Sequence, residues 1–140
     1  MNLQDEKCVL VLDPQLPPGL IANTAAILGI TLGKALPEAV GPDVADQGGN
    51  PHRGIIAFPV PVLKGTPECI RALRAALYRP EFQAVTAVDF SDLAQGCKTY
   101  EEFIAKMAQA PACSLRYFGV ALCGPKKLVN QLTGSLPLLR

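Results

Sequence analysis

Acidic side chains follow two apolar segments of the chain, at positions where a carboxylate could take part in chemistry. Asp13 comes directly after the apolar run at residues 8–12, and Asp89 lies near the end of the mostly apolar run at residues 84–90, with Ser91 and Asp92 just beyond it. A carboxylate at a strand end can orient water or accept hydrogen bonds from a ligand. Asp89 is therefore a candidate catalytic residue. The structural alternative is a turn carboxylate that accepts hydrogen bonds from nearby backbone N–H groups.

Polar and basic side chains also lie near the start of two predicted helices. Gly19, Asn23 and Thr24 begin the first helix, where Asn23 either hydrogen-bonds a ligand or caps the first turn. Lys126 and Lys127 open the last helix, where cations are disfavoured by roughly 0.3–1 kcal/mol. Lysines placed against the local electrostatics indicate an anionic ligand, and the alternative is two solvated side chains. We expect an anion site here, next to Asn23 and Asp89.

Nucleophilic and metal-binding residues are few. His52 is the only histidine and lies in a turn-rich stretch at residues 41–54, which we expect to be an exposed, mobile excursion. The five cysteines include no C-x-x-C pair, which argues against a disulfide framework and against zinc. Most are expected to be packed as small hydrophobic residues, with Cys97 the exception in a polar loop. We expect no metal site and no cofactor.

The elements that must position these residues alternate along the chain. We predict strands at residues 8–12, 55–63, 84–90 and 115–123, and helices at residues 20–36, 66–78, 99–110 and 124–132. Strands separated by helices predict a three-layer α/β/α fold with a mixed, mostly parallel four-stranded sheet. The continuous apolar run at residues 8–12 predicts a central strand. Pro59 and Pro61 cannot donate hydrogen bonds to a neighbouring strand, so residues 55–63 should form an edge strand.

The first helix should be central and buried. It is almost free of charge, and at about 100° per residue its small residues gather on one side. These small residues are Ala22, Ala25, Ala26, Gly29 and Gly33. We expect this small-residue face to pack closely against the sheet or a partner helix, because two glycines inside a helix cost about 1 kcal/mol each relative to alanine. Asn23 and Thr24 would then face a cleft.

Composition narrows the classes of partner. A chain of 140 residues with a net charge of +1 fits a single domain over residues 1–140 and gives no support for nucleic-acid binding. Residues 20–36 carry too many polar residues and glycines for a membrane helix. The polar start is followed by an apolar run too short for a signal peptide, which predicts a cytoplasmic protein.

Three segments resemble the type II peptidyl-tRNA hydrolases and a related group of small uncharacterised bacterial proteins. They are GLIANTAAI at residues 19–27, VDFS at residues 88–91, and LCGPKKL with LTGSL between residues 122 and 136. The resemblance implies the hydrolase fold. It also implies that Asp89 matches the family's functional aspartate, and that Ser114 stands where the family has a threonine hydroxyl.

Departures from the family's pattern bear on activity. The family's two lysines fall on Pro18 and Leu20, and its histidine falls on Ile27. A carboxylate without the neighbouring positive charge loses a group that would orient it and stabilise an oxyanion, and such a loss typically lowers the rate by about 10² to 10³. We therefore expect no peptidyl-tRNA hydrolase activity comparable to that family. Relative to the pattern of that family, residues 96–111 form an insertion, which we expect to contain its own helix.

Three functions follow, and the sequence leaves open whether the chain is an enzyme. The favoured one is a binding protein on a degenerate hydrolase fold, which holds a small anionic or nucleotide-like ligand in the cleft. The second is a hydrolase of another ester or amide, with Asp89 orienting water and Ser114 or Asn23 holding the oxyanion. The third is a structural or partner-binding subunit, such as a homodimer, that uses the small-residue helix or the proline-bearing edge strand.

Overall fold

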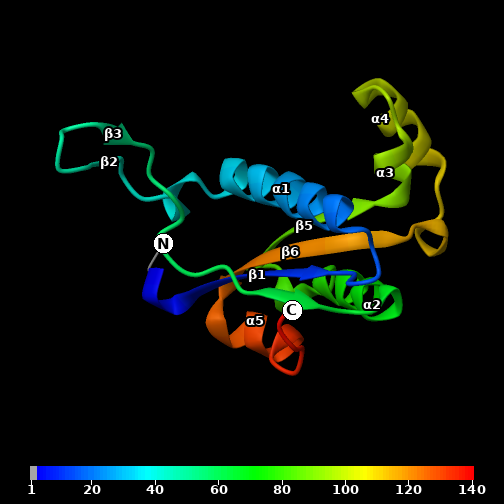
Figure 1. Cartoon of the computed structure of the whole chain (residues 1–140). Helices are drawn as coiled ribbons and strands as arrows, with labels where there is room; N and C mark the ends of the chain where they lie inside the picture. Colours follow the sequence, from blue (N-terminus) through cyan, green and yellow to red (C-terminus); the bar gives the residue numbers. More distant parts are fainter. Residues whose placement is uncertain (1–2) are drawn as a thin grey trace.

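A four-stranded sheet forms the centre of the protein. The computed structural model describes residues 3–140, and the strands lie in the order β4-β1-β6-β5 (Figure 1). They span Glu6–Leu12 (β1), Val62–Lys64 (β4), Thr86–Ser91 (β5) and Tyr117–Pro125 (β6). The continuous apolar run therefore becomes an interior strand, as predicted, with all of residues 8–12 buried between β4 and β6.

The prediction of a mostly parallel sheet is wrong. β1 is parallel to β4, but β6 runs antiparallel to both β1 and β5. The chain leaves the carboxyl end of β5, forms α3 (Asp92–Gly96) and α4 (Tyr100–Gln109), and re-enters the sheet at the same end. A continuous apolar run indicates that a strand is covered on both faces, but it contains no information about the direction of the strand relative to its neighbours.

The proline-bearing segment lies at the end of the sheet, but its regular part is short. Only Val62–Lys64 pairs with β1, and Pro59 and Pro61 precede the strand. The outer side of β4 is covered by the C-terminal segment. Lys64 N donates to Pro137 O at 3.0 Å, and Leu139 N donates to Val62 O at 2.8 Å. An edge that would otherwise present unpaired backbone groups is thus capped by residues 137–139.

Helices cover both faces of the sheet (Figure 1). α1 (Pro18–Ala35) packs on one face through Thr24, Leu28 and Leu32. α2 (Pro67–Leu77) and α5 (Lys126–Thr133) pack on the other face. α2 begins as predicted: Thr66 Oγ1 accepts a 3.1 Å hydrogen bond from Cys69 N, with proline at the first helical position.

The predicted insertion helix is also confirmed. α4 begins after Thr99, whose Oγ1 accepts from Glu102 N at 3.1 Å, and it ends at Gln109 before Pro111. α3 was missed because it has only one turn. Three short 3-10 helices connect the main elements: η2 (Pro37–Ala39), η3 (Pro80–Phe82) and η4 (Ala112–Ser114). Across residues 3–140, no helix is both long and apolar enough to cross a membrane.

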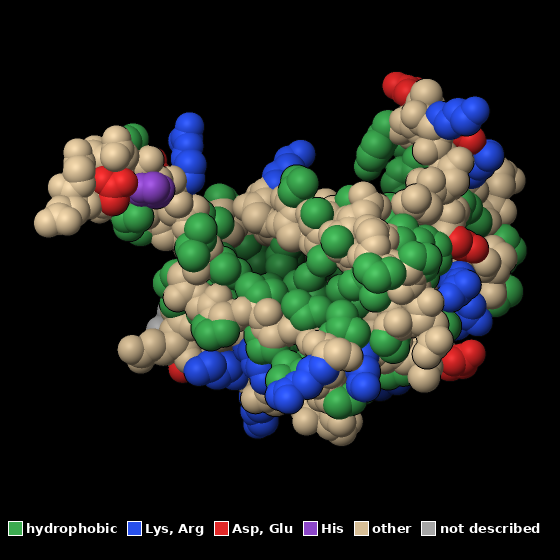
Figure 2. All heavy atoms as spheres, viewed as in Figure 1, with side chains coloured by type: hydrophobic (Ala, Val, Ile, Leu, Met, Phe, Trp, Pro, Cys, Tyr) green, Lys and Arg blue, Asp and Glu red, His purple; other side chains and the backbone are tan. Residues whose placement is uncertain are grey.

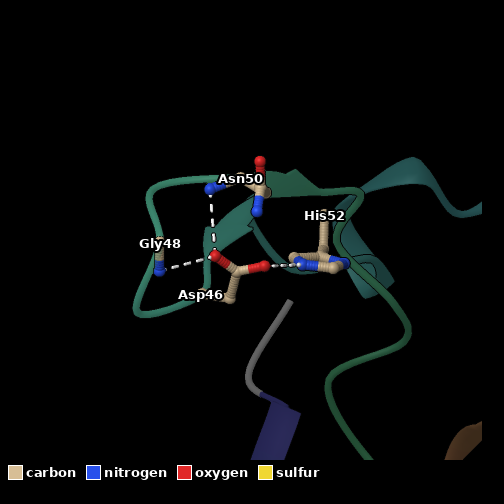
Figure 3. A network of polar contacts seen from close by, with 4 residues as sticks. All are labelled: Asp46, Gly48, Asn50 and His52. Atoms are coloured by element: carbon tan, nitrogen blue, oxygen red, sulfur yellow. Dashed lines mark hydrogen bonds and ion pairs between the residues drawn. The ribbon is translucent and has the colours of Figure 1, made fainter.

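The turn-rich excursion forms a small hairpin that projects from the body of the protein (Figure 1). β2 (Val44–Ala45) pairs antiparallel with β3 (Pro51–His52). Asp46 holds the turn: its Oδ1 accepts from Gly48 N at 2.9 Å and from Asn50 N at 3.0 Å, and its Oδ2 lies 2.9 Å from His52 Nε2 (Figure 3). His52 is therefore partnered within the hairpin.

Candidate ligand-binding site

Contrary to the prediction, α1 is not a buried helix, since only Thr24, Leu28 and Leu32 are buried. Most of its small-residue face does not pack against the sheet, and Ala25 is the member that packs against the core. Ala22, Ala26 and Gly29 are exposed, and a Cβ built on Gly29 or Gly33 would meet no atom within 4 Å. The glycine that permits close packing lies in the sheet instead. A Cβ on Gly119 of β6 would come within 2.5 Å of Leu12 Cδ2 and 3.0 Å of Thr24 Cγ2.

A cavity of about 280 Å³ lies between the C-terminal half of α1 and the sheet. Gly29 and Gly33 line it from the helix, and Cys8, Leu10 and Cys123 line it from the sheet. The remaining walls are all apolar: Ala25, Leu32, Leu36, Ala39, Val40, Ile56 and Val60. Figure 2 shows the hollow beneath α1, surrounded by hydrophobic side chains.

One wall of the cavity is an extended strap, defined here as residues 55–61. Ala57 N donates to Ala39 O at 2.9 Å, and Gly41 N donates to Ile55 O at 2.8 Å. Ile56 and Val60 line the cavity from the strap. Ala57, Pro59 and Pro61 line a second pocket of about 590 Å³. The strap therefore separates an apolar cavity from a neighbouring, more polar pocket.

Two thiols lie together on the sheet side of the apolar cavity. Cys8 of β1 and Cys123 of β6 are directly opposite each other in the antiparallel register, and each is about 1% exposed. A hydrogen bond between the thiols, together with burial, raises the pKa of Cys8, while the same hydrogen bond lowers the pKa of Cys123. All five cysteines, which lie within residues 3–140, are free thiols.

Asp89, the strongest sequence candidate, is engaged in an ion pair. Its Oδ2 accepts a 2.7 Å hydrogen bond from Arg74 Nε of α2. The Arg74 guanidinium also lies 3.9 Å from the centre of the Tyr78 ring. The side chains of Asp89 and Arg74 are only 23% and 12% exposed. Asp89 thus bonds to a helix on the face of the sheet opposite to α1.

The other residues predicted near Asp89 lie apart from it. Asn23 Nδ2 is 3.5 Å from Gln95 Oε1 of α3, a weak contact between exposed side chains. Gly19 is exposed at the start of α1. Thr24 is fully buried, and its Oγ1 has no hydrogen-bond partner within the described part of the chain. Ser114 Oγ donates to Pro111 O at 2.7 Å in η4 and is exposed.

Lys126 and Lys127 start α5, as predicted, but at the other end of the sheet from Asp89. In the strand register Pro125 is opposite Glu6, whereas Asp89 is opposite Val120. The predicted anion site next to Asn23 and Asp89 is therefore not assembled. The predicted site is not assembled because β6 is antiparallel to its neighbours. The carboxyl end of β6, and the helix α5 that follows it, therefore lie at the opposite end of the strands from the carboxyl end of β5. Lys126 instead lines the second pocket, beside Lys7.

Sequence reasoning also missed several residues that the fold brings together. Asp13 is fully buried and accepts from Gln15 N at 2.9 Å and from Arg116 Nη2 at 3.0 Å. Cys97 Sγ donates to Leu93 O at 3.2 Å. Within residues 3–140, no group of three or more His, Cys, Asp or Glu side chains is placed to hold a metal ion. Strand position drew attention to Asp13 and Asp89, but nothing in the sequence indicated that Arg116 would pair with Asp13 or Arg74 with Asp89.

Comparison with known proteins gives a family and a fold. The family described as "Protein of unknown function (DUF2000)" matches residues 6–140. The solved structure of a protein of unknown function from Agrobacterium tumefaciens strain C58 superposes with a TM-score of 0.84 at 18% sequence identity, over 96% of this chain and 97% of that one. A comparison with curated proteins found no match.

Proposed function

We propose that this chain, which belongs to the DUF2000 family of proteins of unknown function, binds a small molecule with an apolar body in the cavity beneath α1. One observation carries the proposal: three small residues of α1, Ala25, Gly29 and Gly33, line a hollow whose other walls are almost entirely apolar. Glycines inside a helix cost stability, and here no close packing compensates for them. Space for a bound molecule is the role that fits their placement.

The size and lining of the cavity support an apolar ligand. Engineered apolar cavities of about 150 Å³ stay free of water and bind benzene, so a larger one has room for a substituted ring or a short hydrocarbon chain. Burial of apolar surface contributes about 25 cal/mol per Å². A ligand that fills this cavity would bind mainly through that effect, because the lining residues are apolar, glycine or cysteine.

An anionic ligand has support at the second pocket rather than at Asp89. Lys7 and Lys126 both line that pocket, and Lys7 Nζ donates to Asn130 Oδ1 at 2.6 Å. Glu6 lines it too, and would oppose an anion. Any attraction by the exposed Lys126 would be screened over about 8 Å at physiological salt. We therefore propose that an anionic group of a ligand would bind near Lys126 in the second pocket, on the other side of the strap from the apolar cavity.

A fold shared with the type II peptidyl-tRNA hydrolases remains part of the proposal, supported by the motifs at residues 19–27, 88–91 and 122–136. Hydrolysis has less support than binding. Asp89 is neutralised by Arg74, Ser114 bonds to its own turn, and Asn23 contacts α3. A water molecule held by Asp89 would have none of the predicted oxyanion donors beside it.

Ligand-induced stabilisation of matched variants tests the binding function. We expect toluene, indole and cyclohexane to raise the melting temperature of the wild type, because a ligand that binds only the folded state stabilises it by about 2.7 kcal/mol at a hundred times its Kd. Gly29→Leu should remove the response, since its side chain would extend into the cavity. Ala22→Leu places the same side chain on an exposed part of the same helix and should keep the response.

Equal responses of the Gly29→Leu and Ala22→Leu variants would show that the probes bind elsewhere. No response in the wild type, with both variants folded, would contradict an apolar ligand in this cavity. Thermal scans without probe establish whether both variants fold.

A further inference from the structure

We propose that Cys8 and Cys123 form a dithiol site for a trivalent arsenical that carries one hydrocarbon group, with the arsenic on the two sulfurs and the hydrocarbon in the cavity beneath α1. The proposal rests on the cavity being a ligand site, as proposed above, and names the chemistry of its ligand. Most cavities lined by apolar residues offer a ligand only contact surface. This one adds two adjacent nucleophiles.

The strand register places the two thiols side by side. Residues directly opposite each other in an antiparallel pair have Cα atoms about 4.5–5.5 Å apart, and their side chains leave the sheet on the same face. Cys8 and Cys123 are such a pair, and both line the cavity. A single atom of the ligand can therefore reach both sulfurs without rearrangement of the strands.

Two thiols, with no third suitable side chain beside them, limit the kind of metal or metalloid atom that can bind. Structural zinc takes four protein ligands, and within residues 3–140 no group of three His, Cys, Asp or Glu residues is suitably placed. Trivalent arsenic with one carbon substituent needs only two sulfurs, because the carbon occupies its third position. The cavity walls accept that substituent: at about 280 Å³, the space exceeds the roughly 150 Å³ that holds benzene.

The reaction balances without an oxidant or reductant. An arsenic(III) oxide of the form R–As=O loses its oxygen as one water molecule, which takes the two thiol protons, and two As–S bonds form while arsenic stays trivalent. Thiolate is the attacking species. One thiol attacks the arsenic first, and the other thiol, directly opposite it in the strand register, then closes the second As–S bond.

Titration of reduced protein with phenylarsine oxide tests the site, read by intact mass and by the count of remaining thiols. We expect one arsenical per chain, an added mass equal to the reagent less one water, and the loss of two thiols. A variant with Cys69→Ser, Cys97→Ser and Cys113→Ser should keep this stoichiometry. Cys8→Ser or Cys123→Ser should weaken binding by about 10² or more, because the second thiol acts at a high effective concentration.

The location is tested in the chain that keeps only Cys8 and Cys123. Gly29→Leu should weaken binding of the phenyl reagent more than that of methylarsine oxide, and Ala22→Leu should leave both unchanged. Unchanged binding of the arsenical after loss of Cys8 or Cys123 would overturn the proposal, as would a triple variant that no longer binds. If toluene stabilises the wild type but the arsenical does not bind, only the dithiol proposal fails. If neither binds, the proposed function fails with it.

Discussion

The carboxylate of Asp89 is held by Arg74 on the face of the sheet opposite to α1, so we expect its contribution to be structural. Asp89→Ala should lower the free energy of unfolding by about 1–3 kcal/mol, because it leaves a mostly buried guanidinium without its charged partner. Chemical denaturation measures this. Glu81→Ala is the control, since its ion pair with Arg79 is long, at 3.9 Å, and exposed, and should contribute little.

The same variant tests the enzymatic alternative. We expect the wild type to show no peptidyl-tRNA turnover comparable to type II hydrolases, because leucine and isoleucine occupy positions 20 and 27. Robust turnover that disappears in Asp89→Ala would mean that the lysine and histidine are dispensable. It would also make the ion pair with Arg74 part of a catalytic site.

Asp46 makes the hairpin sensitive to acid. The hydrogen bond with His52, followed by that from Asn50 N, lowers the pKa of Asp46 below its ordinary value of 3.8. A carboxyl with a lowered pKa in the folded state stabilises that state above its unfolded pKa, and this contribution is lost as pH falls through the folded value. We therefore expect the Gly48 and Asn50 amide resonances to shift as the pH falls below about 4.

Asp46→Asn is the matched variant for this titration. It keeps an acceptor oxygen but cannot titrate, so the acid-dependent shift of both amides should be absent. If the amides of Asp46→Asn shift as those of the wild type do, another group controls the turn.

The cysteine pair shows why residue-level inference from sequence was incomplete. Cys8 and Cys123 each sit inside an apolar run, where a buried thiol is usually a packed small side chain. Nothing in either run indicates the other. Their proximity depends on strand order and on register, and a shift of one residue would turn one thiol to the other face of the sheet.

At the level of single elements, Gly29 and Gly33 of α1 face open space, whereas Gly119 of β6 lies where α1 and the sheet pack closely. Gly29→Ala and Gly33→Ala should each stabilise the protein by up to about 1 kcal/mol, because the added methyl groups meet open space and alanine favours the helix. Gly119→Ala should destabilise it, since the new Cβ would lie 2.5 Å from Leu12 Cδ2 and 3.1 Å from Val11 O. Thermal unfolding of the three variants measures both effects.

Stabilisation by Gly119→Ala would show that α1 can move away from the sheet at little cost. Destabilisation by Gly29→Ala would mean that the small-residue face contacts something in solution, such as a second copy of the chain.

Local signals predicted where two of the helices begin. Thr66 and Thr99, the first residues of the helices predicted at 66–78 and 99–110, cap those helices, because a hydroxyl before a helix satisfies a free backbone N–H whatever the rest of the fold does. Strand direction was not predictable in the same way. The helix α4 was predicted, but the return of the chain to the same end of the sheet is a property of the tertiary structure.

At the level of the whole molecule, the error in the predicted direction of β6 explains why the predicted site residues lie apart. Because β6 is antiparallel to β1 and β5, Lys126 lies at the end of the sheet near Glu6, and Asp89 lies near the opposite end. The layered architecture and the central position of β1 were predictable, because a continuous run of apolar residues indicates a strand that is buried on both faces. The cavity beneath α1 was not, because a stripe of small residues indicates close packing and empty space equally well.

The pairing of β1 with β6 also has a consequence for how the chain folds. The strand that organises the sheet comes from the beginning of the sequence, yet its antiparallel neighbour comes from near the end. Contacts between such distant segments require closure of a large loop, which slows folding relative to a chain with local contacts. The two cysteines meet only when that loop closes. A reagent that must bind both thiols would therefore react only with chains in which β1 and β6 have already paired. The rate at which such a reagent is bound during refolding would report how fast the centre of the sheet forms.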